Sequence, residues 1–248
     1  PMRHVGTASA LSMLIIVILG SHALNAFRLF DRRWTSTKIL LDVNLGDTRL
    51  TSDEPSDWNR CAAGSLTEWN TQLPERGFQF VQRPGKSVPA VAGDALNSVR
   101  FADDVFGLSF GSGVVSITHV ISRLTAGIDE TLEADILLNS NIAFNCYRGP
   151  QQVSHSGQRV HDLRRTVTHA LGHVIGLGHP DGVRYSGAAL MDAMAGGSDT
   201  LQPNDIQGAR MLFGTVAAMI PFPPRDQVRE FFQELETEYQ TTLGRSDT

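Results

Sequence analysis

The sequence predicts an α/β (α+β) fold in which a long helix lies against a twisted, mixed β-sheet and a small C-terminal subdomain follows. Three observations lead to this prediction. Segments with strand periodicity and segments with helix periodicity follow one another along the chain. The chain has 248 residues, of which 41% are hydrophobic, enough to bury a full core. No period of about 20 to 50 residues repeats, which argues against a solenoid or a propeller.

The first predicted elements are a strand and a helix. Residues 37–45 ("TKILLDVNL") are rich in β-branched and aliphatic side chains, as strands are. Residues 62–73 carry apolar side chains at helical spacing: Leu66, Trp69 and Leu73. We expect Ser65 to be the N-cap of this helix, because Glu68 follows three residues later as in a capping box.

Four further strands are predicted. Residues 77–82 ("GFQFVQ") and 97–103 ("NSVRFAD") alternate apolar and polar side chains, which suits half-buried strands. Residues 113–123 ("GVVSITHVISR") and 133–145 ("EADILLNSNIAFN") supply two more. Together these segments predict the mixed sheet.

The next helix carries most of the chemistry. The segment "VHDLRRTVTHALGHVIGLGH" has one apolar face, formed by Val160, Leu163, Val167, Leu171 and Val174. His169 and His173 are four residues apart, so a helix places them one turn apart on a common side. Gly176 can adopt a positive φ, which lets the helix stop there.

Three histidines in this segment predict a zinc site. The imidazoles of His169 and His173 can present their nitrogens to one tetrahedral Zn²⁺ ion. The turn at Gly176 lets His179 complete a triad of ligands. One histidine on an apolar face is usually a core residue, but three with a glycine at this place predict metal binding.

At these residues the sequence resembles a known protease family. "HALGHVIGLGH" is similar to the metzincin zinc-binding consensus H-E-x-x-H-x-x-G-x-x-H, which a methionine turn follows. Within that clan the chain is most similar to the matrixins, the matrix-metalloproteinase-like family, and looks like a prokaryotic member. The segments "SLTEWN", "EADILLN", "ALMDAM" and "LQPNDIQGARMLFG" also resemble that family, over about residues 38–214.

The resemblance implies a metzincin-like fold and a zinc-dependent endopeptidase. It implies that Met191 lies beneath the zinc as a hydrophobic floor, with Met194 the weaker candidate. It also implies that residues 201–214 form a closing helix. We consider Ca²⁺ as a second cofactor.

The largest departure from the family is Ala170, which stands where the consensus has its catalytic glutamate. A methyl group cannot transfer the proton that peptide hydrolysis requires. Pro1 ahead of Met2 is interpreted as a cloning remnant, so we expect an engineered, inactivated protease. The alternative is a natural zinc-binding pseudoprotease that acts as a peptide- or protein-binding module.

Smaller departures concern latency and a second zinc. No cysteine-switch propeptide motif occurs, and the histidine pattern of the second, structural zinc of animal matrixins is not apparent. His119, His155 and His161 are therefore expected to be ordinary surface or packing residues.

The ends of the chain are expected to lie outside the catalytic domain. Residues 1–23, with the apolar run "LSMLIIVILG", are typical of a signal peptide or an N-terminal hydrophobic segment. We expect a linker over residues 24–36, the matrixin-like catalytic domain over 37–220, and a C-terminal amphipathic helix and tail over 221–248.

The signal-like segment predicts a secreted or periplasmic protein, with membrane anchoring as the alternative. Two cysteines, Cys61 and Cys146, are then expected to form a disulfide. The alternative is that Cys61 blocks the zinc as a thiolate.

The predicted partner is a protein or peptide substrate. The formal net charge of -5 gives no reason to expect nucleic acid, and short basic runs such as "LRRT" (residues 163–166) are expected to be solvated helix faces. In the resembled fold the strand before the active site is a sheet edge to which an extended peptide can add. Val115 and Ser116 are therefore the candidate substrate-binding residues; contact with a membrane through residues 1–23 stays open, as does the oligomeric state.

Overall fold

The computed structural model describes residues 27–30, 32–46, 57–74, 77–84, 90–125, 128–180, 189–193 and 198–213. The hydrophobic segment expected at residues 1–23, Met194, and the amphipathic helix expected at 221–248 lie outside these residues. The elements are β1 Arg28–Leu29, β2 Arg32–Arg33, β3 Lys38–Val43, α1 Trp58–Gln72, β4 Gln79–Pro84, β5 Ser98–Ala102, β6 Ser116–Thr125, β7 Ile128–Asn139, β8 Phe144–Asn145, β9 Gln152–Val153, β10 Arg159–Asp162, α2 Leu163–Ile175, β11 Leu177–Gly178 and α3 Pro203–Leu212.

The main sheet is mixed, as predicted. Its strands run in the order β2-β7-β5-β3-β4, and β6 pairs with β7. β3, β4, β5 and β7 are parallel, whereas β6 runs antiparallel to β7. In the part of the chain that the structure describes, β7 is the only strand paired with β6, so β6 forms an edge of the sheet.

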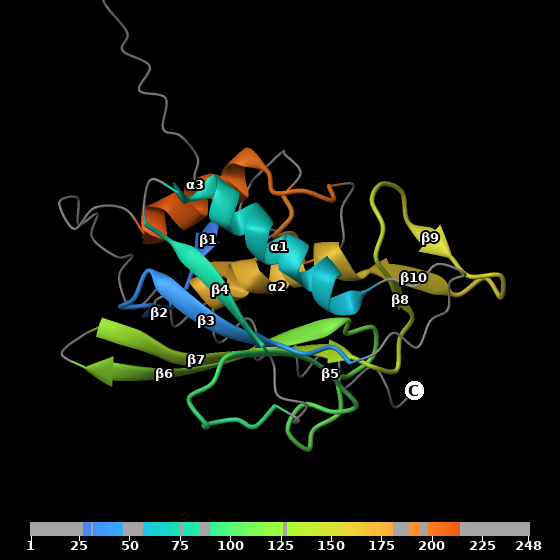
Figure 1. Cartoon of the computed structure of the whole chain (residues 1–248), viewed down its shortest axis with the longest axis horizontal. Coiled ribbons are helices and arrows are strands. Elements are labelled where there is room, and N and C mark those ends of the chain that lie inside the picture. Colours follow the sequence, from blue (N-terminus) through green and yellow to red (C-terminus); the bar gives the residue numbers. More distant parts are fainter. Residues whose placement is uncertain are drawn as a thin grey trace, which may run out of the picture.

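The helices cover one face of this sheet (Figure 1). Thr118 of β6 points toward α2, because its hydroxyl donates to the carbonyl of Ala170 at 3.3 Å. Side chains alternate along a strand, so His119 and Ile121 face the other way. The ring of His119 meets Phe106 there, and the Ile121 side chain approaches Gly93. The segment before β5, which contains Gly93, and the segment between β5 and β6, which contains Phe106, therefore both contact the second face.

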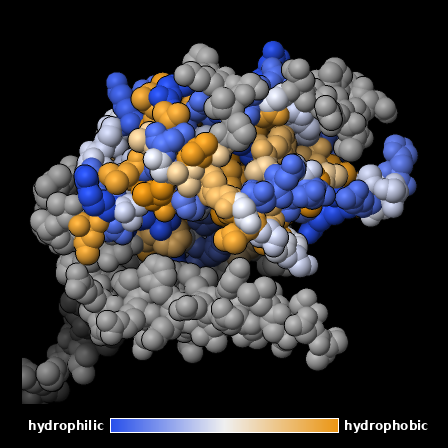
Figure 2. All heavy atoms as spheres, turned by 90° about the horizontal axis from the view of Figure 1, so that it is seen from below, coloured by the Kyte–Doolittle hydropathy of each residue, from blue (hydrophilic) through white to orange (hydrophobic). Residues whose placement is uncertain are grey.

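A single hydrophobic core lies between the helices and the sheet. It includes Trp69 of α1, Leu171 of α2 and Ile136 of β7. Leu201 and Ala209, expected in a separate C-terminal subdomain, belong to the same core. Seen from below, the surface mixes apolar and hydrophilic residues (Figure 2), and the exposed large apolar side chains of the described residues come from several elements.

The start of α1 differs from the prediction. The helix begins at Trp58 and its N-cap is Asp57, whose carboxylate accepts a hydrogen bond from the Arg60 N–H at 3.0 Å. Ser65, the predicted N-cap, lies in the middle of the helix and is fully buried. Its hydroxyl donates to the carbonyl of Arg164 at 2.9 Å, so this serine joins α1 to α2. The sequence alone assigned Ser65 to a helix cap, but in the structure its hydroxyl bonds to a buried carbonyl 99 residues away.

Two other boundaries shift. The predicted strand 133–145 ends at Asn139, and only Phe144–Asn145 returns to a strand, as β8. Val160, predicted on the apolar face of the histidine helix, is buried in β10, since α2 begins only at Leu163 with Asp162 as its N-cap.

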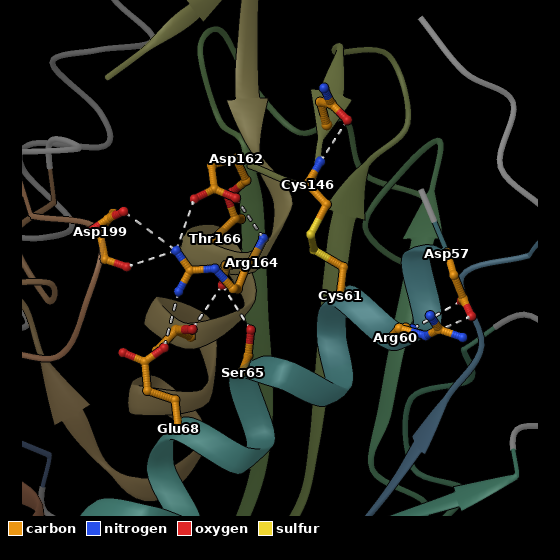
Figure 3. The surroundings of a disulfide bond; sticks show 12 residues. Asp57, Arg60, Cys61, Ser65, Glu68, Cys146, Asp162, Arg164, Thr166 and Asp199 are labelled. Carbon is orange, nitrogen blue, oxygen red and sulfur yellow. Dashed lines mark hydrogen bonds and ion pairs between the residues drawn. A yellow bond between two sulfur atoms is a disulfide. The ribbon is translucent and has the colours of Figure 1, made fainter. Parts of the chain in front are cut away.

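The two cysteines form the predicted disulfide, which joins α1 to the segment after β8 (Figure 3). Cys61 is thus not available as a zinc-blocking thiolate. Such a bond is consistent with an exported protein. Among the described residues, no helix has the length and apolar character needed to cross a membrane.

Candidate metal centre

The metal ligands predicted from sequence come from α2 and the turn that follows it. α2 places His169 and His173 one turn apart. The helix ends at Gly176, which has φ 110° and lies in the left-handed region, as expected for a C-cap glycine. The chain then reverses through β11, which brings His179 back to the other two histidines.

The three imidazoles converge through their Nε2 atoms. These atoms are 2.9 Å apart between His169 and His173, and 3.1 Å apart from each of these residues to His179. Two nitrogens bound to one tetrahedral zinc at ~2.0–2.1 Å lie about 3.3 Å apart. The observed separations are within a few tenths of an ångström of that value, so the triad could hold a metal ion.

Backbone carbonyls set the tautomers of two histidines. Nδ1 of His169 lies 2.8 Å from the carbonyl of Leu190, and Nδ1 of His173 lies 2.8 Å from the carbonyl of Leu177. A carbonyl only accepts, so each Nδ1 must carry a proton, and in the neutral imidazole Nε2 then presents a lone pair. Two such lone pairs that face each other repel. A cation between them removes this repulsion, as a metal ion bound by histidines does.

The environment of His173 favours its neutral form. Burial lowers the pKa of His173 well below its ordinary value, and the neighbouring His169 and His179 lower it further. Metal ligation by histidine requires the neutral imidazole. Both the geometry and the neutral form of His173 are therefore those that metal ligation requires.

Met191, which the resemblance placed beneath the zinc as a hydrophobic floor, packs against α2. The side chain is 2% exposed, and a Cβ added at Gly172 would stand only 2.2 Å from its Sδ atom. Gly172 therefore lets the methionine approach the helix between the two histidines. Met191 packs here and is not one of the converging ligands.

Asp205 holds the turn around Met191 and was missed by sequence analysis. This carboxylate, 1% exposed on α3, accepts hydrogen bonds from the backbone N–H groups of Leu190, Met191 and Gln202 at 2.8–3.2 Å. The carbonyl of Leu190 in turn orients His169. Burial raises the pKa of Asp205, although these three donors oppose the shift. Asp205 thus positions a predicted ligand through the backbone.

Arg164 is buried at the start of α2, so the expectation that "LRRT" is a solvated face is wrong. The guanidinium lies 3.3 Å from Glu68, 3.8 Å from Asp162 and 3.6 Å from Asp199 (Figure 3). Three carboxylates from separate segments compensate the buried charge. Glu68 also accepts the N–H of Leu201 at 2.9 Å, so this network joins α1, α2 and the segment before α3.

Ala170 lies beside the first ligand, on the side of α2 that faces β6. The residue is 1% exposed, and its carbonyl accepts the Thr118 hydroxyl. The position expected for a general base therefore adjoins both the triad and the edge strand. Its methyl group offers no proton acceptor.

The two substrate-binding candidates direct their backbone groups to opposite sides. The carbonyl of Val115 accepts the N–H of Asn139 at 3.0 Å and is therefore used within the sheet. In an antiparallel pair successive residues direct their backbone groups to opposite sides. Ser116, paired with Leu138, therefore directs its backbone groups away from β7. The structure thus removes the Val115 carbonyl from peptide binding and leaves Ser116 as a candidate.

The other histidines of the described residues, His119, His155 and His161, lie outside the triad. His119 packs against Phe106 and His161 against Phe144, while His155 is exposed. Burial lowers the pKa of His161. Among the described residues, His169, His173 and His179 are the only group of three or more converging side chains suited to a metal. The expectation of Ca²⁺ stays a prediction.

Comparison with known proteins gives no family. No family model matches the sequence, and no curated protein matches it. Among solved structures, the chain is similar to one in the "GM1 bound form of the ECX AB5 holotoxin", at 11% sequence identity and a TM-score of 0.40. That match covers 73% of this chain and 84% of the toxin chain.

These comparisons contradict the expectation that the chain is a metzincin of the matrixin family. The consensus shared with that family is short, and neither a family model nor a curated protein matches the sequence. We therefore withdraw the family assignment, and with it the expectation of a prokaryotic matrixin. The histidine triad stands on its own geometry.

Proposed function

We propose that the chain is a zinc-dependent endopeptidase in which Ala170 occupies the place of the general base. The observation that carries this proposal is the convergence of three imidazole nitrogens within 3.1 Å. Catalytic zinc sites characteristically have three protein ligands and an open fourth position, whereas structural sites are closed by four. Two histidines one helical turn apart, with a glutamate after the first, are typical of zinc proteases.

Bound zinc would lower the pKa of a coordinated water and polarise the carbonyl of a peptide bond. The residues of the chain do the rest of the positioning. His169 and His173 are held by backbone carbonyls in the tautomer that a metal requires. The side of β6 that pairs with no other strand among the described residues lies next to Ala170, and its backbone groups, starting at Ser116, could accept an extended peptide as an added strand.

Ala170 offers no proton acceptor at the position that follows the first histidine of the triad. Loss of a general base removes about 10²–10⁴ in rate, so the chain should bind peptides with little turnover. We infer that a glutamate has been replaced at this position, because the three histidines that could bind zinc remain in place. The alternative is a natural zinc-binding pseudoprotease that binds peptides, and the buried Ala170 itself favours it.

The disulfide supports export, and we infer a secreted or periplasmic protein. Anchoring to a membrane through residues 1–23 is the alternative. The proposed partner is an unfolded protein or a peptide.

Metal analysis tests the first part of the proposal. The purified chain should contain about one zinc per molecule, which a chelator removes and which His173→Ala fails to retain. A folded chain that takes up no zinc would refute both the protease and the pseudoprotease.

Restoring the base tests the second part. Ala170→Glu should cleave a denatured protein substrate, and a chelator should stop the cleavage. Ala170→Gln is the matched control, because the glutamine has a similar size but cannot accept the proton. If folded, zinc-loaded Ala170→Glu cuts no better than Ala170→Gln, the endopeptidase is refuted and the pseudoprotease remains.

A further inference from the structure

A short N-terminal segment lies against the turn that carries the second and third histidines. We call residues 27–30 and 32–34 the N-terminal strap. In the strap, β1 pairs antiparallel with β11, with Arg28 opposite Gly178 and Leu29 opposite Leu177. The N–H of Phe30 donates to the carbonyl of Gly176 at 2.8 Å. The sequence had predicted only a linker over these residues.

This pairing determines where the carbonyl of Leu177 points. In an antiparallel pair, hydrogen-bonded and non-hydrogen-bonded positions alternate. Phe30 and Gly176 form a hydrogen-bonded position, so Leu177, opposite Leu29, directs its carbonyl away from β1. That carbonyl accepts Nδ1–H of His173 at 2.8 Å. The strap therefore holds the group that orients the second ligand, and Gly178 beside it leads directly into His179.

Side chains of the strap contact the same region. The Phe30 ring lies 6.1 Å from the His173 ring, and the Arg32 guanidinium lies 4.2 Å above Phe30. The indole N–H of Trp34 donates to the carbonyl of Val174 at 2.7 Å, one of the carbonyls that the end of α2 leaves without a helical partner.

Glycines make room for the strap on both sides. A Cβ at Gly178 would lie 3.2 Å from the Arg28 side chain. A Cβ at Gly208 of α3 would lie 2.9 Å from both Phe27 and Leu177. The strap is thus packed between the turn and α3.

We propose that the N-terminal strap is a positioning element of the metal site, which sets metal affinity by holding the Leu177 carbonyl and the turn to His179. The inference rests on the proposed function only in that zinc binds the triad. His169 is oriented from the other side, through Asp205 and Leu190. The strap and Asp205 therefore support different ligands of one site.

Two proline variants of the full chain test the proposal. Phe30→Pro removes the N–H that donates to Gly176, whereas Leu29→Pro removes an N–H that faces away from β11. Each change introduces a proline and removes one large apolar side chain, so a purely structural effect should be similar in both. The zinc dissociation constant is measured by chelator competition, together with the visible spectrum of the Co²⁺-loaded protein.

Phe30→Pro should weaken zinc binding by about 10–100-fold and alter the Co²⁺ spectrum, whereas Leu29→Pro should change the affinity by less than about threefold. If Phe30→Pro does not fold, Trp34→Phe takes its place, with an expected weakening of roughly 3–10-fold. Equal affinities in the parent and the Phe30 or Trp34 variant, or an equal loss in Phe30→Pro and Leu29→Pro, would overturn the strap proposal and leave the proposed function standing. A parent chain that binds no zinc would overturn both.

Discussion

Replacing Gly172 with alanine should destabilise the protein, whereas the same replacement at Gly64 should stabilise it. Both glycines lie inside helices, Gly172 in α2 and Gly64 in α1. Alanine is favoured over glycine in a helix interior by about 0.5–1 kcal/mol. Helix propensity alone therefore predicts stabilisation at both positions, so any difference in sign must come from packing.

The structure gives the size of the packing effect. A Cβ at Gly172 would lie 2.2 Å from Sδ and 2.9 Å from Cε of Met191, and 3.4 Å from the ring of Trp69. Trp69 is fully buried and Met191 is 2% exposed, so the methionine has little space into which to move. Overpacking of this kind costs about 1–3 kcal/mol, which exceeds the helix gain and leaves a net loss of about 1 kcal/mol. No atom lies within 4 Å of a Cβ at Gly64, so only the helix gain remains.

Urea denaturation of the parent and the two variants measures this difference. Gly64→Ala should move the midpoint up and Gly172→Ala should move it down. In a Met191→Ala background the loss at Gly172 should vanish, because the clashing atoms are gone. Equal stabilisation by both alanines in the parent background would refute the packing argument, and with it the close approach of Met191 to the histidine helix.

Three further predictions follow from the site and the core. Asp205→Asn should lower zinc affinity by about 10–100-fold, because the turn that orients His169 loses an acceptor; an unchanged chelator-competition constant would contradict this. Burial raises the pKa of Asp135 to about 6, above an unfolded value near ~4, so its stabilising contribution is present below pH ~4 and is lost as pH rises through about 6. Asp135→Asn should therefore gain stability relative to the parent as the pH of urea unfolding rises from about 4 to about 7, and a constant difference would exclude this. Replacing both Cys61 and Cys146 with alanine should cost about 4–5 kcal/mol of unfolding free energy for a loop of 85 residues, and an unshifted guanidinium midpoint would count against that loop-entropy estimate.

Local patterns in the sequence were enough to predict the elements that present the three converging histidines. The four-residue spacing of His169 and His173 fits a helical turn, and Gly176 marks the end of that helix, because both signals depend only on backbone geometry over a few residues. The mixed sheet and the disulfide were predicted for similar reasons, from strand alternation and from an even number of cysteines.

Local patterns gave wrong predictions where a side chain can make either a local or a long-range interaction. Ser65 has the spacing of an N-cap, but a buried serine hydroxyl bonds equally well to a distant carbonyl, here that of Arg164. Arg164 itself was taken for a solvated residue, because a sequence does not show that Glu68 and Asp199 lie beside it in the fold. The family assignment failed for a related reason, since a short ligand motif carries little information about the rest of the chain.

The sequence by itself determined which residues could bind a metal, whereas only the tertiary structure decided what holds them. Asp205 acts on His169 through the backbone of Leu190, and the N-terminal strap acts on His173 through the carbonyl of Leu177. Neither interaction is marked in the sequence by a periodicity or a motif, because the interacting residues belong to separate elements that meet only when the core forms. The backbone groups they use are common to nearly all residues, so side-chain identity does not reveal them and only the folded chain selects among them.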